Sequence, residues 1–138
     1  MGGVSQSPNP LYATTRFRVT SLPARWPAEF VIIAAYAPTG QKWSDADNTA
    51  ADHKLGTELA SLDPWRLRIT GYSPDTGHAE PGWAVELSIE EGRKIGRWFD
   101  QDAIFVVRAD ALGYVSCKGD GKVTWFGAFR ERMSAELP

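Results

Sequence analysis

Two uninterrupted apolar runs predict the central strands of a sheet. They are Phe30–Tyr36 (FVIIAAY) and Ala103–Val107 (AIFVV), and neither contains a charged side chain. A strand that is buried on both faces has this pattern, whereas a half-exposed strand alternates. Both runs are therefore expected to lie inside the sheet.

Shorter segments alternate between apolar and polar residues, which indicates strands with one buried face. In the clearest of them, Trp65, Leu67 and Ile69 alternate with Arg66 and Arg68. Arginines on one face are typical of an edge strand, where they discourage aggregation. The sequence therefore predicts an edge strand here. The other predicted strands are 14–20, 83–87, 114–117 and 123–126.

Helical spacing of apolar residues predicts two helices. The first runs from about Asp45 to Ser61, and the second from Ser88 to about Phe99, where Ser88 and Glu91 form a capping-box pattern. The residues expected to face the core are Ala51, Leu55, Leu59 and Leu62 in the first helix, and Ile89, Gly92, Ile95 and Phe99 in the second.

The resulting order, β-α-β-β-α-β, is that of a ferredoxin-like α+β core with extra N- and C-terminal strands and an antiparallel or mixed sheet. The alternative is a three-layer α/β fold with parallel central strands. Because the run 30–36 is apolar on both sides, something should also cover the second sheet face. The N-terminal strand, the C-terminal segment or a second copy of the chain would do so, and the last option predicts a homodimer.

Length and composition indicate one small domain. The chain has 138 residues, 43% hydrophobic and 23% charged. We expect a disordered leader at 1–11, a single domain at 12–132 and a tail at 133–138. A lone cysteine, no secretory pattern and no membrane-spanning run favour a cytoplasmic protein that does not enter a membrane.

Net charge gives little support for nucleic acid as a partner. The formal charge is −2, without a strong basic field. Arg16, Arg18, Arg66 and Arg68 would offer a basic face, but arginines on an edge strand also have the structural explanation given above. Nucleic-acid binding is therefore not expected.

The predicted topology brings three segments to one edge of the sheet: 36–48, 72–82 and 100–102. In the first segment, Ser44 and Asp47 form another capping-box pattern, which explains the serine without a ligand. The alternative is an anion site at the helix start, with Gly40 allowing close approach and Lys42 adding charge. Asn48, one helical turn after Ser44, would face the same ligand or cap the helix. Tyr36 would stack on the ligand or hydrogen-bond to it.

The second segment contains His78 and Glu80. On an extended chain these side chains point to the same side, and a histidine and a carboxylate together can transfer protons. An exposed polar loop would explain them equally well. Cys117 beside Lys118 is either a nucleophile or a packed core residue. The spacing of His and Cys predicts no metal site, and no cofactor is expected.

Several short motifs, in order, resemble a bacterial family, that of domain of unknown function 3293. They are AAYAPTG, Ser44 with Asn48, HAEPGW, FDQDAIFVV, and Cys117 with GAFR. The resemblance spans about 30–130. This chain departs from the family pattern at Ala37, Gly82 and Asp100, where Asn, Ser and Gly are usual. The resemblance implies that the following residues are signature positions: Tyr36, Pro38, Gly40, Ser44, Asn48, His78, Glu80 and Gln101.

These observations predict a small protein that binds a polar or anionic metabolite at the loop edge of the sheet. His78 and Glu80 are the catalytic candidates for hydrolysis or group transfer. The expected ligand-binding residues are Tyr36, Pro38, Gly40, Lys42, Ser44, Asn48 and Gln101. The alternative is a dimeric interaction module, acting as a regulator or inhibitor without catalysis.

Overall fold

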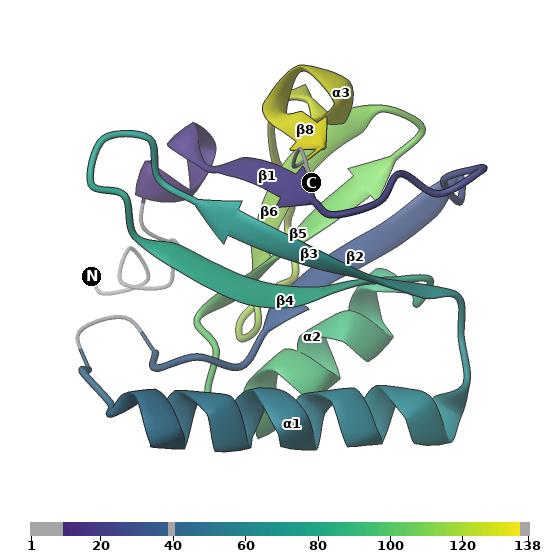
Figure 1. Ribbon diagram of the computed structural model, residues 1–138. Helices are drawn as coiled ribbons and strands as arrows, with labels where there is room; N and C mark the ends of the chain where they lie inside the picture. The colour runs from purple at the N-terminus through teal and green to yellow at the C-terminus, as the bar shows by residue number, and fades with distance from the viewer. Residues whose placement is uncertain (1–9, 39–40, 136–138) are drawn as a thin grey trace.

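One curled eight-stranded sheet organises the protein, with the strand order β7-β6-β5-β2-β4-β3-β1-β8 (Figure 1). The structure is a computed structural model and describes residues 10–38 and 41–135. The fold is a mixed α+β fold. The strands are β1 (Arg16–Val19), β2 (Glu29–Ala34), β3 (Arg66–Tyr72), β4 (Ala79–Val85), β5 (Ala103–Arg108), β6 (Ala111–Ser116), β7 (Thr124–Ala128) and β8 (Met133–Ala135).

The two long helices lie where the apolar spacing predicts them. They are α1 (Asp45–Leu62) and α2 (Ile89–Trp98), and both lie on the same side of the sheet (Figure 1). Ser44 and Ser88 cap their first turns. The short helix α3 (Phe129–Arg132) and a 3-10 turn, η2 (Pro10–Thr14), lie near the chain ends. No helix in the described part of the chain is long and apolar enough to cross a membrane.

The path β2-α1-β3-β4-α2-β5 places four strands side by side in the order β5-β2-β4-β3. All three neighbouring pairs are antiparallel. The three-layer alternative required β2 and β5 to be parallel, and their antiparallel register, with Phe30 opposite Val107, shows that this expectation is wrong. Among the described strands, β1 and β8 form the one parallel pair.

The prediction that β3 is an edge strand is also wrong. β3 lies between β4 and β1, with Thr70 opposite Pro81 on one side and Arg18 on the other. The N-terminal strand β1 therefore pairs with the edge of β3 that was expected to be exposed. β7 and β8 are the outer strands of the sheet.

On the helix side, an aliphatic core joins the sheet to α1 and α2. Leu55 and Leu59 of α1 and Ile95 of α2 pack against strand residues such as Ile33 and Ile104. The predicted stripe of α1 is wrong at its end, because Leu62 in the last turn is 53% exposed. The helix ends at Leu62, and the left-handed backbone of the capping residue Asp63 (φ 51) turns the chain back toward the sheet.

The second sheet face carries an aromatic core and is covered by the chain itself. Phe17 of β1, Phe30 of β2 and Phe129 of α3 are buried there. The rings of Phe17 and Phe30 each lie within 6 Å of the Phe129 ring, at 5.9 and 5.4 Å. Both terminal segments thus contribute to this cover, as two of the three sequence-based options anticipated. Residues 133–135, expected to belong to a tail, form β8 beside β1.

Candidate functional site

The chain turn that follows β2 is held by two side chains that the sequence marks as ligand candidates. Asn48 Oδ1 accepts a hydrogen bond from the backbone N–H of Ala37 at 2.8 Å. Gln101 Nε2 donates to the carbonyl oxygens of Tyr36 at 2.8 Å and Phe99 at 3.1 Å. Both side chains are partly buried and satisfy backbone groups that would otherwise lack partners. Their polar atoms fix the turn that presents Tyr36.

The other candidates in this segment differ in their surroundings. Ser44 Oγ accepts from the Asp47 backbone N–H at 3.1 Å, which is the capping role that a serine before a helix favours. Lys42 is exposed and Pro38 is buried. Gly40 lies outside the described residues. The helix start therefore already uses its serine for capping.

His78 and Glu80 face each other on the hairpin between β3 and β4. Their Nε2 and Oε2 atoms are 2.7 Å apart, as the i, i+2 spacing predicts. The turn is closed by a hydrogen bond from Ser73 N to the His78 carbonyl at 2.9 Å, and by Gly77 with φ 75. The His78 side chain is 68% exposed, so this pair lies at the rim of the sheet.

The hydroxyl of Tyr36 lies near charged side chains of the hairpin, α1 and β3. Burial raises the pKa of its hydroxyl, the charge of Asp52 raises it further, and Arg68 lowers it. Asp45 and Glu80 also raise this pKa, so all four charges lie within electrostatic reach of the hydroxyl. Gln101 of the third segment contacts the Tyr36 carbonyl, and the register of β2 with β4, with Ala34 opposite Gly82, brings the end of the second segment beside the start of the first.

A second set of residues, not singled out as a site from the sequence, lies between α1 and the sheet. The Arg68 guanidinium of β3 forms two hydrogen bonds to the Asp52 carboxylate of α1, at 2.9 and 3.0 Å. It also stacks over the ring of Trp83, 4.6 Å from the centroid, because the two residues are directly opposite on β3 and β4. The polar face of β3 is thus directed toward α1.

These residues line a groove of about 520 Å³, here named the α1–β3 groove. Its lining combines three basic side chains (His53, Arg66 and Arg68) with one carboxylate, that of Asp52. The full lining is Asp52, His53, Gly56, Thr57, Ala60, Arg66, Arg68 and Trp83.

Trp83 and Gly56 bring α1 close to the sheet beside this groove. The indole Nε1 of Trp83 is buried, with no hydrogen-bond partner among the described residues. A methyl group built on Gly56 would lie 3.5 Å from the Trp83 ring, in ordinary van der Waals contact. The sequence offered two signals for this groove: the arginines alternating on β3, and the glycine inside α1.

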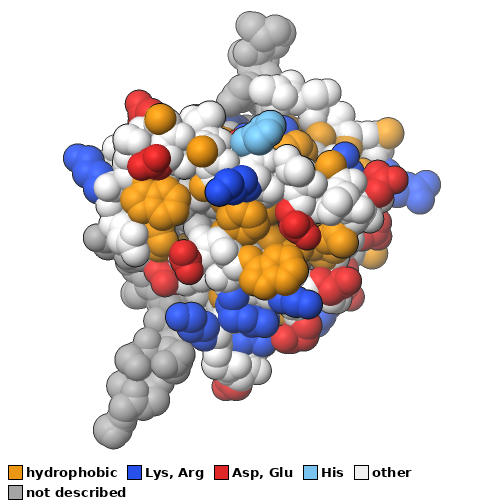
Figure 2. Space-filling model, turned by 90° about the horizontal axis from the view of Figure 1, so that it is seen from below, with side chains coloured by type: hydrophobic (Ala, Val, Ile, Leu, Met, Phe, Trp, Pro, Cys, Tyr) orange, Lys and Arg blue, Asp and Glu red, His pale blue; other side chains and the backbone are white. Residues whose placement is uncertain are grey.

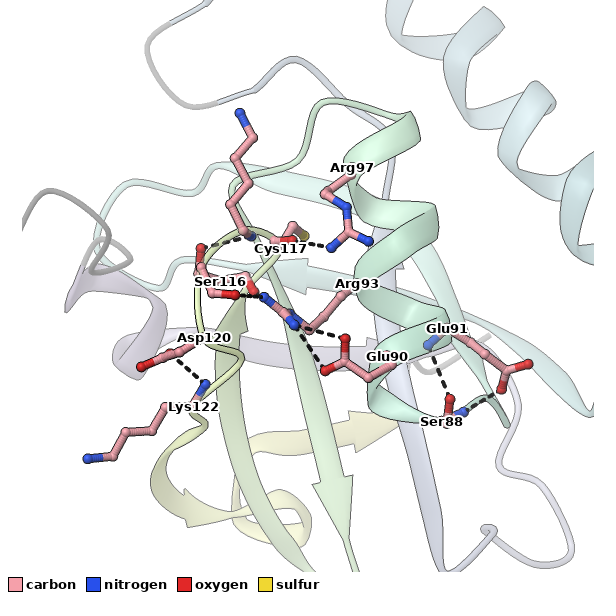
Figure 3. Close-up of polar contacts among 11 residues, drawn as sticks. Ser88, Glu90, Glu91, Arg93, Arg97, Ser116, Cys117, Asp120 and Lys122 are labelled. Atoms are coloured by element: carbon pink, nitrogen blue, oxygen red, sulfur yellow. Dashed lines mark hydrogen bonds and ion pairs between the residues drawn. The ribbon is translucent and has the colours of Figure 1, made fainter. Parts of the chain in front are cut away.

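Elsewhere, Arg93 and Cys117 have structural roles (Figure 3). Arg93 of α2 is 5% exposed and donates to the carbonyls of Ser116 and Gly119 and to the Glu90 carboxylate. Arg97 donates to the Cys117 carbonyl. The Cys117 side chain is fully buried, and burial raises the pKa of its thiol to about 11, which supports core packing rather than nucleophilic attack.

Asp100, where the family resemblance implies a glycine, follows the end of α2. Its φ is 57, in the left-handed region where glycine is least strained and aspartate is tolerated. Within the described residues, no group of three or more His, Cys, Asp or Glu side chains is arranged to hold a metal ion.

Comparison with curated proteins and with solved structures finds no match for this chain. A family model does match. The matched segment, residues 33–104, begins in β2, contains α1, β3, β4 and α2, and ends in β5, so that it includes the Tyr36 turn, the His78 hairpin and the α1–β3 groove. Because this segment is more than half of the chain, the protein belongs to the family described as protein of unknown function (DUF3293).

Proposed function

We propose that this protein binds a small anionic metabolite in the α1–β3 groove, beside the Tyr36 turn. The observation that supports this most is the lining, which contains two arginines, a histidine and an aromatic side chain against one carboxylate. Guanidinium groups recognise carboxylates and phosphates through paired hydrogen bonds. A small polar acid with an apolar body fits this combination.

Arg66 is the side chain best placed to capture the anionic group. Its guanidinium donates to the Pro64 carbonyl at 3.2 Å and is 3.5 Å from Asp63, whose side chain is 91% exposed. That ion pair is weak in water. Arg68 is held by Asp52 and Trp83, so it supplies a fixed positive charge beside the ligand, while the Trp83 ring provides a flat apolar surface.

The His78–Glu80 pair is the candidate for proton transfer in a hydrolysis or group-transfer reaction. Its 2.7 Å contact and its exposure leave His78 accessible to a reacting group. Tyr36 lies within electrostatic reach of Glu80, and burial and the nearby carboxylates raise the pKa of its hydroxyl. In this proposal, the α1–β3 groove binds the metabolite, and the His78–Glu80 pair, which lies on the hairpin outside the groove lining, is a separate candidate for proton transfer.

We further infer that the four strands in the order β5-β2-β4-β3 form an elaborated ferredoxin-like unit. Their antiparallel pairing and the two helices on one face support this assignment. We also infer a cytoplasmic location, which agrees with the single cysteine being a buried thiol.

The alternative function is a dimeric interaction module. It is supported by Trp125, which is 41% exposed on the outer strand β7, under the guanidinium of Arg108 at 5.5 Å. An outer strand offers unpaired backbone groups to a partner strand. Loss of a dimer in Trp125→Lys, with no small-molecule binding, would support this function over metabolite binding.

The proposal is tested by thermal-shift screening against small carboxylates, phosphates and sulfonates. A compound that binds the folded state raises the melting temperature with concentration. We expect hits for the wild type that are lost in Arg66→Gln and in Arg68→Gln. Arg130→Gln is the matched control, because Arg130 lies outside the groove and its side chain is 85% exposed. Hits that persist in both groove variants, or no hits at all, would contradict the proposal.

A further inference from the structure

A second cavity lies on the other side of α1, between α1 and the end of α2. Its volume is about 440 Å³, and it is here named the α1–α2 pocket. Figure 2 looks onto the helix side of the molecule, where hydrophobic side chains reach the surface among acidic and basic ones. The pocket is lined by Ala35, Trp43, Asp47, Ala50, Ala51, Lys54, Trp98, Phe99 and Asp100.

Aromatic rings form much of this lining. Trp98 at the end of α2 is 57% exposed, an unusual exposure for so large an apolar side chain. The ammonium group of Lys94 already lies over its ring, 5.2 Å from the centroid, so the ring attracts cations. Trp43, before α1, is oriented by a hydrogen bond from its Nε1 to Gln41 Oε1 at 3.1 Å.

Two carboxylates, those of Asp47 and Asp100, line the pocket beside its aromatic rings. Asp47 comes from the first turn of α1, and Asp100 follows α2 in a left-handed conformation. The lining has one basic residue, Lys54, and the ammonium group of Lys94 lies over the Trp98 ring, where a bound cation would replace it. Neither carboxylate forms an ion pair within the described part of the chain. The floor is apolar, since Ala35 is fully buried.

We propose that the α1–α2 pocket binds a small organic cation with a methylated or quaternary ammonium group. The ammonium group lies against the Trp43 and Trp98 rings, with Asp47 and Asp100 near it and the alanine floor below. Aromatic rings with nearby carboxylates recognise such groups because the cation is attracted to the ring face and is only weakly hydrated. This site is separate from the α1–β3 groove and has the opposite charge preference.

The test is a tryptophan-fluorescence titration with choline and with its uncharged carbon isostere, in which a tert-butyl group replaces trimethylammonium. The two compounds have nearly the same shape, so the difference between them reports the charge. We expect saturable binding of choline and about tenfold weaker binding of the isostere. Equal binding of the two compounds, or no saturable response to choline, would overturn the proposal.

Variants locate the site. Trp98→Leu removes a largely exposed ring and leaves the buried core unchanged, so the protein should fold and lose choline binding. Asp100→Asn should weaken choline binding several-fold without affecting the isostere. The matched control is Trp125→Leu, an exposed tryptophan outside the pocket, which should bind choline as the wild type does. Retention of binding in Trp98→Leu would overturn the assignment. Arg66→Gln should leave choline binding unchanged, because Arg66 lines the α1–β3 groove and not the α1–α2 pocket.

Discussion

For Asn48, the sequence indicated where the residue lies but not which group its side chain binds. Its side chain lies at the predicted edge of the sheet, yet its Oδ1 accepts from the Ala37 backbone N–H. Gln101 does the same for the Tyr36 carbonyl. A sequence shows which residues can hydrogen-bond, but not whether the partner is a ligand or the chain itself.

Substitution of Asn48 separates these roles. In Asn48→Ala the partly buried Ala37 N–H loses its acceptor, and we expect a loss of about 1–2 kcal/mol in the free energy of unfolding. Asn48→Asp keeps the acceptor oxygen and should remain close to the wild type. Urea denaturation of the three proteins measures both effects. Equal destabilisation by Ala and Asp would show that the Oδ1 contact contributes nothing.

Cys117 gives a pH-dependent prediction. Its thiol pKa rises from 9.0 in a model peptide to about 11 in the folded protein, chiefly through burial. Between these values the unfolded chain loses its thiol proton first, so the free energy of unfolding should fall as pH rises from 9 to 11. The comparison with Cys117→Ala in chemical denaturation isolates this dependence. Identical slopes in the two proteins would contradict a raised pKa.

Some site residues could not be found from the sequence, for identifiable reasons. Arg68 and Trp83 belong to different strands, and only the register of β3 with β4 places them opposite each other. Arg93 is charged and was not among the residues expected to face the core, yet its guanidinium is satisfied by backbone carbonyls and Glu90. Charged residues become buried where the fold supplies such partners.

At the scale of elements, glycines determine how closely α2 approaches the sheet. A methyl group on Gly96 would lie 2.5 Å from Cys117 Sγ, and one on Gly92 would lie 2.9 Å from Ile104 Cδ1. Both distances are too short for a side chain. The small residues one helical turn apart thus allow close packing against β5 and the end of β6.

A double-mutant cycle tests this contact. Gly96→Ala should cost about 1–3 kcal/mol through overpacking, and Cys117→Ala should cost about 1 kcal/mol or more through the space it leaves. In the double variant the added methyl group partly fills that space, so the combined loss should be smaller than the sum. Purely additive free energies of unfolding would indicate that the two side chains do not meet.

For Gly56 in α1 we expect an alanine substitution to stabilise the protein, in contrast to Gly96. A methyl group there meets only ordinary contacts with Trp83, and alanine favours a helix, so Gly56→Ala should stabilise the protein by about 0.5–1 kcal/mol. The same methyl group occupies part of the α1–β3 groove and should weaken anion binding. Melting temperature and ligand-induced shift should therefore change in opposite directions. A stabilised variant that binds as well as the wild type would contradict the assignment of the groove.

The order of the elements could be predicted from the sequence, whereas some of their neighbours could not. Uninterrupted apolar runs predicted β2 and β5, alternation predicted β1 and β3, and helical spacing predicted α1 and α2. The pairing of β1 with β3 is a contact between distant segments that alternation cannot reveal, which is why β3 was expected at an edge. The short strand β8 has too little pattern to be recognised.

At the scale of the molecule, the curl of the sheet and the terminal segments enclose the aromatic core. The second sheet face was the reason for expecting another copy of the chain, and Phe17 and Phe129 cover that face from within. We therefore predict a monomer of 15.2 kDa in light scattering. A dimer that dissociates in Trp125→Lys would instead indicate assembly through β7 and favour the interaction module.

Nuclear magnetic resonance of the tryptophan indole N–H groups tests the central claim most directly. The chain has six tryptophans, and the Trp83 signal is assigned by its absence in Trp83→Phe. In a titration with an anion found by thermal shift, we predict that the Trp83 signal moves saturably in the wild type and in Arg130→Gln but not in Arg66→Gln. A Trp83 signal that stays fixed while the anion binds would contradict a site in the α1–β3 groove.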